Sequence, residues 1–104
     1  ELLIASHIKP WRVCEGGERL DGANGLMLTP NADRLFDRGF ITFHNDGEVE
    51  ISSRLPASDL GRLGFHEEQV TDRRILRPTT LKSFSPPQRQ YLEYHRNEVF
   101  LPAV

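Results

Sequence analysis

The first part of the chain alternates short apolar runs with polar stretches. Residues 2–5 are apolar and lead into Ser6 and His7, which predicts a buried strand with His7 at the end of a sheet. Residues 9–23 contain three glycines among charged residues and show no apolar period, so we expect a long exposed loop there. Residues 25–28 are again apolar and predict a second strand. The pattern favours two neighbouring strands joined by a long loop.

A short helix is predicted directly after the second strand. Thr29 fits the N-cap position, and Pro30 fits the first helical position, where its missing N–H costs no hydrogen bond. Leu35 and Phe36 are expected to point into the core, and Gly39 is expected to end the helix.

Asp33 and Asp37 are i and i+4 on this predicted helix and therefore share one face. Two like charges at this spacing destabilise an isolated helix by roughly 0.2–0.5 kcal/mol, so something should compensate them. One explanation is a divalent cation, because Mg²⁺ is usually held by one or two carboxylates plus water and phosphate oxygens. The alternative is that Asp33 pairs with Arg34 or Arg38, or that Asp37 simply faces water.

Two later segments predict a β-hairpin. Residues 40–44 and 48–52 flank residues 45–47, and the Asn-Asp-Gly sequence of this connection is a strong turn signal. Alternation of apolar and polar residues places Val49 and Ile51 on one face of the second strand.

The remainder of the chain carries weaker signals. Residues 56–63 predict a short helix, and residues 64–85 show weak strand character near Val70 and at 75–76. A final helix is expected over residues 86–99.

Several single residues invite a chemical interpretation, and for each we expect a structural role. Trp11 is expected to cover the small core rather than to stack on a nucleobase, and Cys14 to be an inert thiol. His44 and His66 are expected to be exposed, and His95 to be a hydrogen-bonded core histidine, because it shares a helical stripe with apolar residues.

Composition indicates one small domain. With 104 residues, of which 38% are hydrophobic, the chain can bury one modest core. No run of eighteen apolar residues exists, so we expect no membrane span. A single cysteine excludes an internal disulfide and fits a reducing cytoplasm. Because the chain starts with Glu1 rather than Met, we expect it to be the C-terminal part of a longer protein.

The net charge of −2 opposes binding to nucleic acid, which normally needs a basic surface. The distribution is uneven, however, because residues 73–96 contain six basic residues and one acidic residue. This stretch is either a basic patch or a set of ordinary surface ion pairs.

Two motifs together resemble the HNH (ββα-metal) endonuclease family. The first is Ser-His-Ile-Lys-Pro-Trp at residues 6–11. The second, residues 24–39, has the Asn, Thr-Pro, Asp-x-x-x-Asp and Arg-Gly order of the nuclease domain of bacterial colicins. The resemblance implies that His7 is a general base, which suits a side chain that titrates near neutrality. It also implies that Asn24 orders the loop.

By the same resemblance, Asp33 and Asp37 take the two metal-ligand positions on the helix. Many members of the family carry an Asp or His directly before the base histidine as a further ligand, whereas this chain has Ser6. A hydroxyl is a weak ligand, so the site is expected to be rich in carboxylates and to favour Mg²⁺ or Mn²⁺ over Zn²⁺. The motifs span residues 2–45 and suggest a subgroup found in bacterial restriction and defence proteins.

The expected fold is α+β: a ββα-metal (HNH) finger extended by a second β-hairpin and a C-terminal helix, forming one nuclease domain over residues 1–104. The expected function is divalent-metal-dependent hydrolysis of DNA phosphodiesters. Arg12 and Arg38 are further candidates for contacting phosphates, and a fused or partner domain would supply targeting. The alternative is an inactive HNH-like module that binds DNA or another protein, which Ser6 and the negative charge favour.

Overall fold

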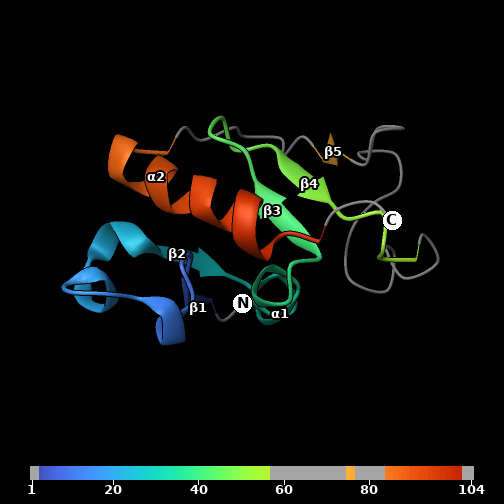
Figure 1. Ribbon diagram of the computed structural model, residues 1–104. Helices are drawn as coiled ribbons and strands as arrows, with labels where there is room; N and C mark the ends of the chain where they lie inside the picture. Colours follow the sequence, from blue (N-terminus) through green and yellow to red (C-terminus); the bar gives the residue numbers. More distant parts are fainter. Residues whose placement is uncertain (1–2, 57–74, 77–83, 102–104) are drawn as a thin grey trace.

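Two antiparallel sheets and two helices make up the part of the chain that the computed structural model describes, which comprises residues 3–56, 75–76 and 84–101 (Figure 1). The first sheet pairs β1 with β2, and the second has the strand order β3-β4-β5. The elements are β1 (Ile4–His7), β2 (Gly25–Leu28), α1 (Pro30–Asp37), β3 (Ile41–Phe43), β4 (Val49–Ile51), β5 (Ile75–Leu76) and α2 (Pro86–Tyr94). The small α+β architecture, with two hairpins and a C-terminal helix, agrees with the sequence prediction.

The β1–β2 pair forms as predicted, but its connection is more ordered than the sequence indicates. The register pairs Ile4 with Leu28 and His7 with Gly25. Three 3₁₀ turns, at Trp11–Val13, Glu18–Leu20 and Gly22–Asn24, lie in the connection. The connection is largely exposed, as predicted, and it folds into these short turns as well.

Strand β1 is not the buried strand that its apolar sequence predicts. Leu3 and Ile4 are 51% and 39% exposed, and Met27 on β2 is 61% exposed, whereas the buried residue is Ser6. Because side chains alternate along a strand, Ile4 shares a face with the buried Ser6, but Ile4 lies at the start of the strand and lines the open pocket beside α1. Composition alone does not say how far the start of a strand is covered.

Local signals place both ends of α1. The Thr29 hydroxyl accepts a hydrogen bond from the Ala32 N–H at 3.3 Å, and Pro30 occupies the first position. Gly39 follows the helix with φ +80°, and a Cβ there would collide with the carbonyl oxygen of Val99. Glycine is therefore required at this position for two independent reasons.

The second hairpin confirms its prediction. Ile41 pairs with Ile51 and Phe43 with Val49, and both β4 residues are buried. Strand β5 pairs with β4, as the weak strand character at 75–76 suggested. His44, which was expected to be exposed, is partly exposed, and its Nε2 lies within hydrogen-bond distance of the Glu50 carboxylate at 2.8 Å. The predicted helix at 56–63, the strand character near Val70 and His66 lie outside the described residues.

Helix α2 starts at the predicted place and ends differently. Ser85 at the N-cap and Gln88 in the first turn form a capping box, and Pro86 is the first residue of the helix. The α-helix stops at Tyr94 and continues as a π-helical turn, His95–Val99, so the final helix has the expected extent but not a uniform winding. Figure 1 shows α2 crossing the molecule between the β1–β2 pair and strands β3 and β4. No helix in the described ranges is long and apolar enough to cross a membrane.

The core is centred on Phe36 and His95. Phe36 is completely buried, and its ring stacks on the imidazole of His95 at 3.7 Å with an interplanar angle of 5°. The His95 Nε2–H donates to the Phe36 carbonyl oxygen at 2.7 Å, so Nδ1 accepts from the Thr42 hydroxyl at 2.8 Å. This arrangement confirms the prediction of a hydrogen-bonded core histidine. Burial lowers the pKa of His95 to about 4, and the nearby Arg96 contributes.

Acidification is expected to destabilise the fold through His95. The folded-state pKa of about 4 lies below the ordinary value of 6.5, so the unfolded chain binds this proton more readily. The free energy of unfolding therefore has its full value above pH 6.5. It falls by about 3 kcal/mol as the pH drops from 6.5 to about 4. Urea unfolding at several pH values checks this, with His95→Gln as the non-titrating comparison. Equal pH slopes for the two proteins, or an imidazole that titrates near its ordinary pKa by NMR, would contradict the expectation.

Candidate active site

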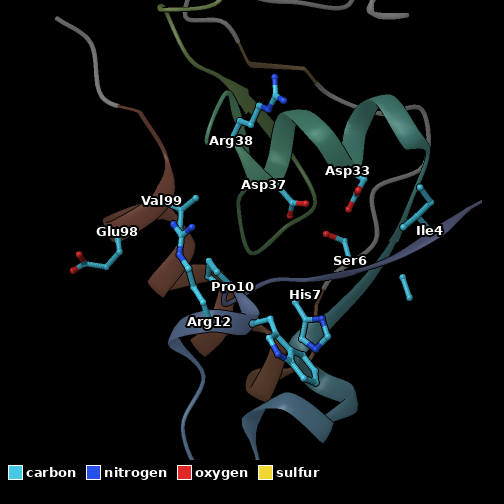
Figure 2. Close-up of a pocket in the computed structure, with 12 residues that line it drawn as sticks. Ile4, Ser6, His7, Pro10, Arg12, Asp33, Asp37, Arg38, Glu98 and Val99 are labelled. Atoms are coloured by element: carbon cyan, nitrogen blue, oxygen red, sulfur yellow. The ribbon is translucent and has the colours of Figure 1, made fainter.

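A pocket of about 820 Å³ gathers most of the sequence-predicted site residues. It lies between β1, the first 3₁₀ turn, α1 and the π-helical turn (Figure 2). Of the candidates from the sequence, the pocket walls contain His7, Arg12, Asp33, Asp37 and Arg38. Asn24 does not line this pocket; it is buried behind the loop that carries Trp11. Residues distant in the sequence thus form one polar cavity.

The two aspartates of α1 face the end of β1. Figure 2 shows the carboxylates of Asp33 and Asp37 pointing from the same side of the helix toward Ser6 and His7. The side chain of Arg38 points away from both carboxylates. The described residues hold no ion pair between either aspartate and an arginine, so this explanation of the i, i+4 pair is not supported.

The carboxylate of Asp37 lies in an unfavourable electrostatic environment. Asp37 is exposed, as the alternative interpretation expected, but partial desolvation by its surroundings raises its pKa, and the neighbouring charge of Asp33 raises it further. The Ser6 hydroxyl and His7 oppose the rise without cancelling it. A positive charge placed between the two carboxylates would relieve this repulsion.

The hydroxyl of Ser6 is also unsatisfied. Ser6 is 4% exposed, and among the described residues its Oγ has no hydrogen-bond partner in good geometry, although Asp37 lies nearby. A buried polar atom without a partner is rare and invites an explanation such as water or an ion. The combination of this atom with two close carboxylates fits a hydrated divalent cation.

The donor set is too small for a closed metal site. It fits an ion that keeps part of its water shell, as Mg²⁺ and Mn²⁺ do. Within the ranges described, no three His, Cys, Asp or Glu side chains lie close enough to hold one ion together. The two carboxylates would hold an ion with water and substrate oxygens completing its shell, which is how Mg²⁺ is commonly bound. A structural zinc site would need four protein ligands.

His7 is fixed in one tautomer by the backbone of the loop. Its Nε2 lies 3.1 Å from the carbonyl oxygen of Arg19, which can only accept, so Nε2 carries the proton. The lone pair of the neutral imidazole is therefore on Nδ1. The ring also meets the indole of Trp11 edge-on, with 5.2 Å between the ring centroids. The sequence could not indicate Arg19 as a partner, because any residue type can supply a backbone carbonyl.

Asn24 holds the loop together from inside. Its Oδ1 accepts from the Lys9 N–H at 2.7 Å, and its Nδ2 donates to the Glu18 carbonyl at 3.2 Å. Nδ2 also approaches the Lys9 carbonyl and the Cys14 sulfur at 3.4 Å each. Asn24 is 1% exposed. Its amide links the two ends of the β1–β2 loop, which also carries the Arg19 carbonyl. Cys14 is engaged in these contacts.

Helix α2 supports the same loop from outside. The Tyr91 hydroxyl donates to the Asp21 carboxylate at 2.8 Å, which lowers the pKa of Asp21 and raises that of Tyr91 to about 12. The Gln88 side chain reaches the Gly25 carbonyl at 3.4 Å. Glu98, on the π-helical turn, lines the pocket. Sequence reasoning missed these residues because their contacts are long-range.

Two expectations about the surroundings need revision or remain open. Trp11 does not cover the core, because 53% of it is exposed and it lines the pocket. Most of the basic residues of the 73–96 stretch lie outside the described residues. Within the described part, Arg96 donates to the Phe43 carbonyl at 2.9 Å and Arg89 to the Phe84 carbonyl at 2.8 Å.

Comparison with known families agrees with this geometry. Residues 1–44 match a family model described as HNH endonuclease. The matched segment contains β1, the loop, β2 and α1, and therefore His7, Asn24 and both aspartates. No curated protein matches the chain. The match supports the HNH family and a nuclease-like function, and nucleases of this family act on DNA and generally use divalent metals.

Proposed function

We propose that this domain is a divalent-metal-dependent endonuclease that hydrolyses DNA phosphodiester bonds. The observation that carries the proposal is the single pocket into which His7 and the two α1 carboxylates all open. An HNH-type assignment of the matched segment supports it. The ββα-metal arrangement of β1, β2 and α1 is part of the same proposal.

His7 acts as the general base. With the proton on Nε2 held by the Arg19 carbonyl, Nδ1 is free to accept a proton from water. The water, having given its proton to His7, attacks phosphorus in line, the bond to the 3′ oxygen breaks, and that oxygen takes a proton from solvent, which leaves a 5′ phosphate and a 3′ hydroxyl. Asn24 is a positioning residue, because it fixes the loop that carries the Arg19 carbonyl.

Asp33 and Asp37 would hold the metal ion. When bound, a divalent cation supplies positive charge that stabilises the leaving 3′ oxygen. The two carboxylates line the side of the pocket formed by α1, and His7 lines the side formed by β1. The Ser6 hydroxyl lies between these groups and is suited to hydrogen-bond a coordinated water. This oxygen-rich surrounding favours Mg²⁺ or Mn²⁺ over Zn²⁺.

Two arginines are the candidates for binding flanking phosphates. Arg12 lines the pocket on the side of the π-helical turn, where it can meet a phosphate next to the scissile one. Arg38 points away from the carboxylates and would contact the backbone farther along the strand. A role in restriction or defence and a fused or partner targeting domain belong to the same proposal, since a net charge of −2 supplies little affinity of its own.

A plasmid-nicking assay tests the proposal. Supercoiled DNA is expected to be converted to the open circular form with Mg²⁺ or Mn²⁺, and EDTA is expected to abolish the conversion because the carboxylates then hold no ion. End analysis should give 5′ phosphate and 3′ hydroxyl termini. A folded protein that leaves plasmid intact with both metals would contradict the proposal and leave the inactive module as the explanation.

A further inference from the structure

We propose that Trp11 stacks on an unpaired nucleobase next to the scissile phosphodiester, so that the enzyme prefers single-stranded or locally opened DNA. The inference rests on the proposed function and goes beyond it by naming the state of the substrate. It starts from the place of Trp11, which lines the same pocket as His7 and Asp37 and keeps 53% of its surface exposed.

The exposed indole packs against two side chains, those of Arg19 and His7. The Arg19 side chain donates from Nε to the Trp11 carbonyl oxygen at 3.0 Å, and its guanidinium carbon lies 4.9 Å from the centre of the indole. Arg19 lines a neighbouring pocket and not the one that contains the carboxylates. The guanidinium therefore backs the indole, while Trp11 itself borders the pocket with the carboxylates.

The indole lies close enough to His7 for both side chains to contact neighbouring parts of one DNA strand. The centroids of the His7 and Trp11 rings are 5.2 Å apart, and successive bases along one strand of B-DNA are separated by roughly 3.4 Å. A base stacked on the indole would thus belong to a nucleotide within about two steps of the phosphate attacked beside His7. The phosphate itself would lie near Arg12, which lines the same pocket.

The chemistry selects an unpaired base. Every nucleobase has an aromatic face that can stack on indole, so the contact is tolerant of sequence, and the cationic group behind the ring adds to it. In an intact duplex both faces of a base are already stacked, so the indole can be used only by a base that has left the stack. A pinned indole loses little side-chain entropy on binding.

The test uses the intrinsic fluorescence of Trp11, which is the single tryptophan of the chain. The full chain is titrated in EDTA, where no cleavage occurs, with a single-stranded dT oligonucleotide, the same oligonucleotide with abasic sites, and a duplex. Stacking should quench the fluorescence with dT, and much less with the abasic strand of equal charge or with the duplex.

Variants provide the matched controls. Trp11→Ala is expected to weaken binding of labelled dT oligonucleotide roughly 5- to 150-fold by fluorescence anisotropy, whereas Trp11→Phe should retain most of the affinity. Met27→Ala removes a different exposed apolar side chain, which lies on β2, and should leave the affinity unchanged.

The outcomes separate this inference from the proposed function. Equal quenching by the abasic and dT strands, or wild-type affinity in Trp11→Ala, overturns the stacking role even if plasmid is nicked. Base-dependent quenching in a protein that cleaves neither plasmid nor single-stranded DNA with Mg²⁺ or Mn²⁺ supports the stacking role and overturns catalysis alone. Preference for duplex over single strand in both assays also overturns the inference.

Discussion

Replacing His7 with alanine is expected to slow plasmid cleavage by about 10²–10⁴-fold, the usual contribution of a general base. The hydrogen bond from Nε2 to the Arg19 carbonyl leaves Nδ1 of the imidazole available to accept a proton from water. The fold should persist, because His7 is only partly buried and is not part of the hydrophobic core. Nicking rates at saturating Mn²⁺ give the measurement, and circular dichroism confirms folding.

His44→Ala is the matched control for this variant. His44 is also partly exposed, but it lies on the second hairpin and pairs with Glu50 outside the pocket. Its loss should leave the cleavage rate unchanged. Wild-type activity in folded His7→Ala would eliminate His7 as the base, and equal losses in both histidine variants would point to an effect on stability instead.

Removal of either α1 carboxylate is expected to weaken Mn²⁺ binding. Asp33→Ala should abolish both binding and cleavage, and Asp37→Ala should raise the Kd for the ion by at least the roughly 10–100-fold that loss of an outer-shell partner typically costs. The physical reason is that the described residues offer few other anionic ligands near the pocket. Calorimetric titration with Mn²⁺ gives the affinities.

Glu93→Ala serves as the control for charge, because Glu93 is exposed on α2 and does not line the pocket. It removes the same negative charge without changing the ligands. Unchanged Mn²⁺ affinity in both aspartate variants would mean that the ion is held elsewhere or not at all, whereas a similar loss in Glu93→Ala would show that only net charge matters.

Local signals in the sequence predicted much of the fold. Thr29 with Pro30 placed the start of α1, and the Asn-Asp-Gly turn placed the hairpin, because caps and tight turns depend on a few adjacent residues. The i, i+4 spacing of Asp33 and Asp37 correctly predicted a shared face. The stripe that contains His95 correctly predicted its burial.

The remaining features depend on long-range packing, which periodicity does not encode. Ile4 is apolar and yet exposed although Ser6 on the same face is buried, because Ile4 lies at the start of the strand and lines the open pocket beside α1. Trp11 was expected over the core but is fixed at the pocket by Arg19, a contact between two turns of the same loop. Neither the carbonyl that orients His7 nor the hydroxyl of Tyr91 that supports the loop has a recognisable sequence pattern.

The stacking of His95 on Phe36 joins the segment that matches the family model to the C-terminal part of the described chain. The segment that matches the family model ends at residue 44. The ring of Phe36 inside it packs against the imidazole of His95, which lies near the end of the described chain. Leu101 also bonds the Gly39 carbonyl at 2.9 Å. Residues 1–44 alone would lack both the imidazole that packs on Phe36 and the backbone group that binds Gly39, so we expect this segment not to keep its packing without the C-terminal residues.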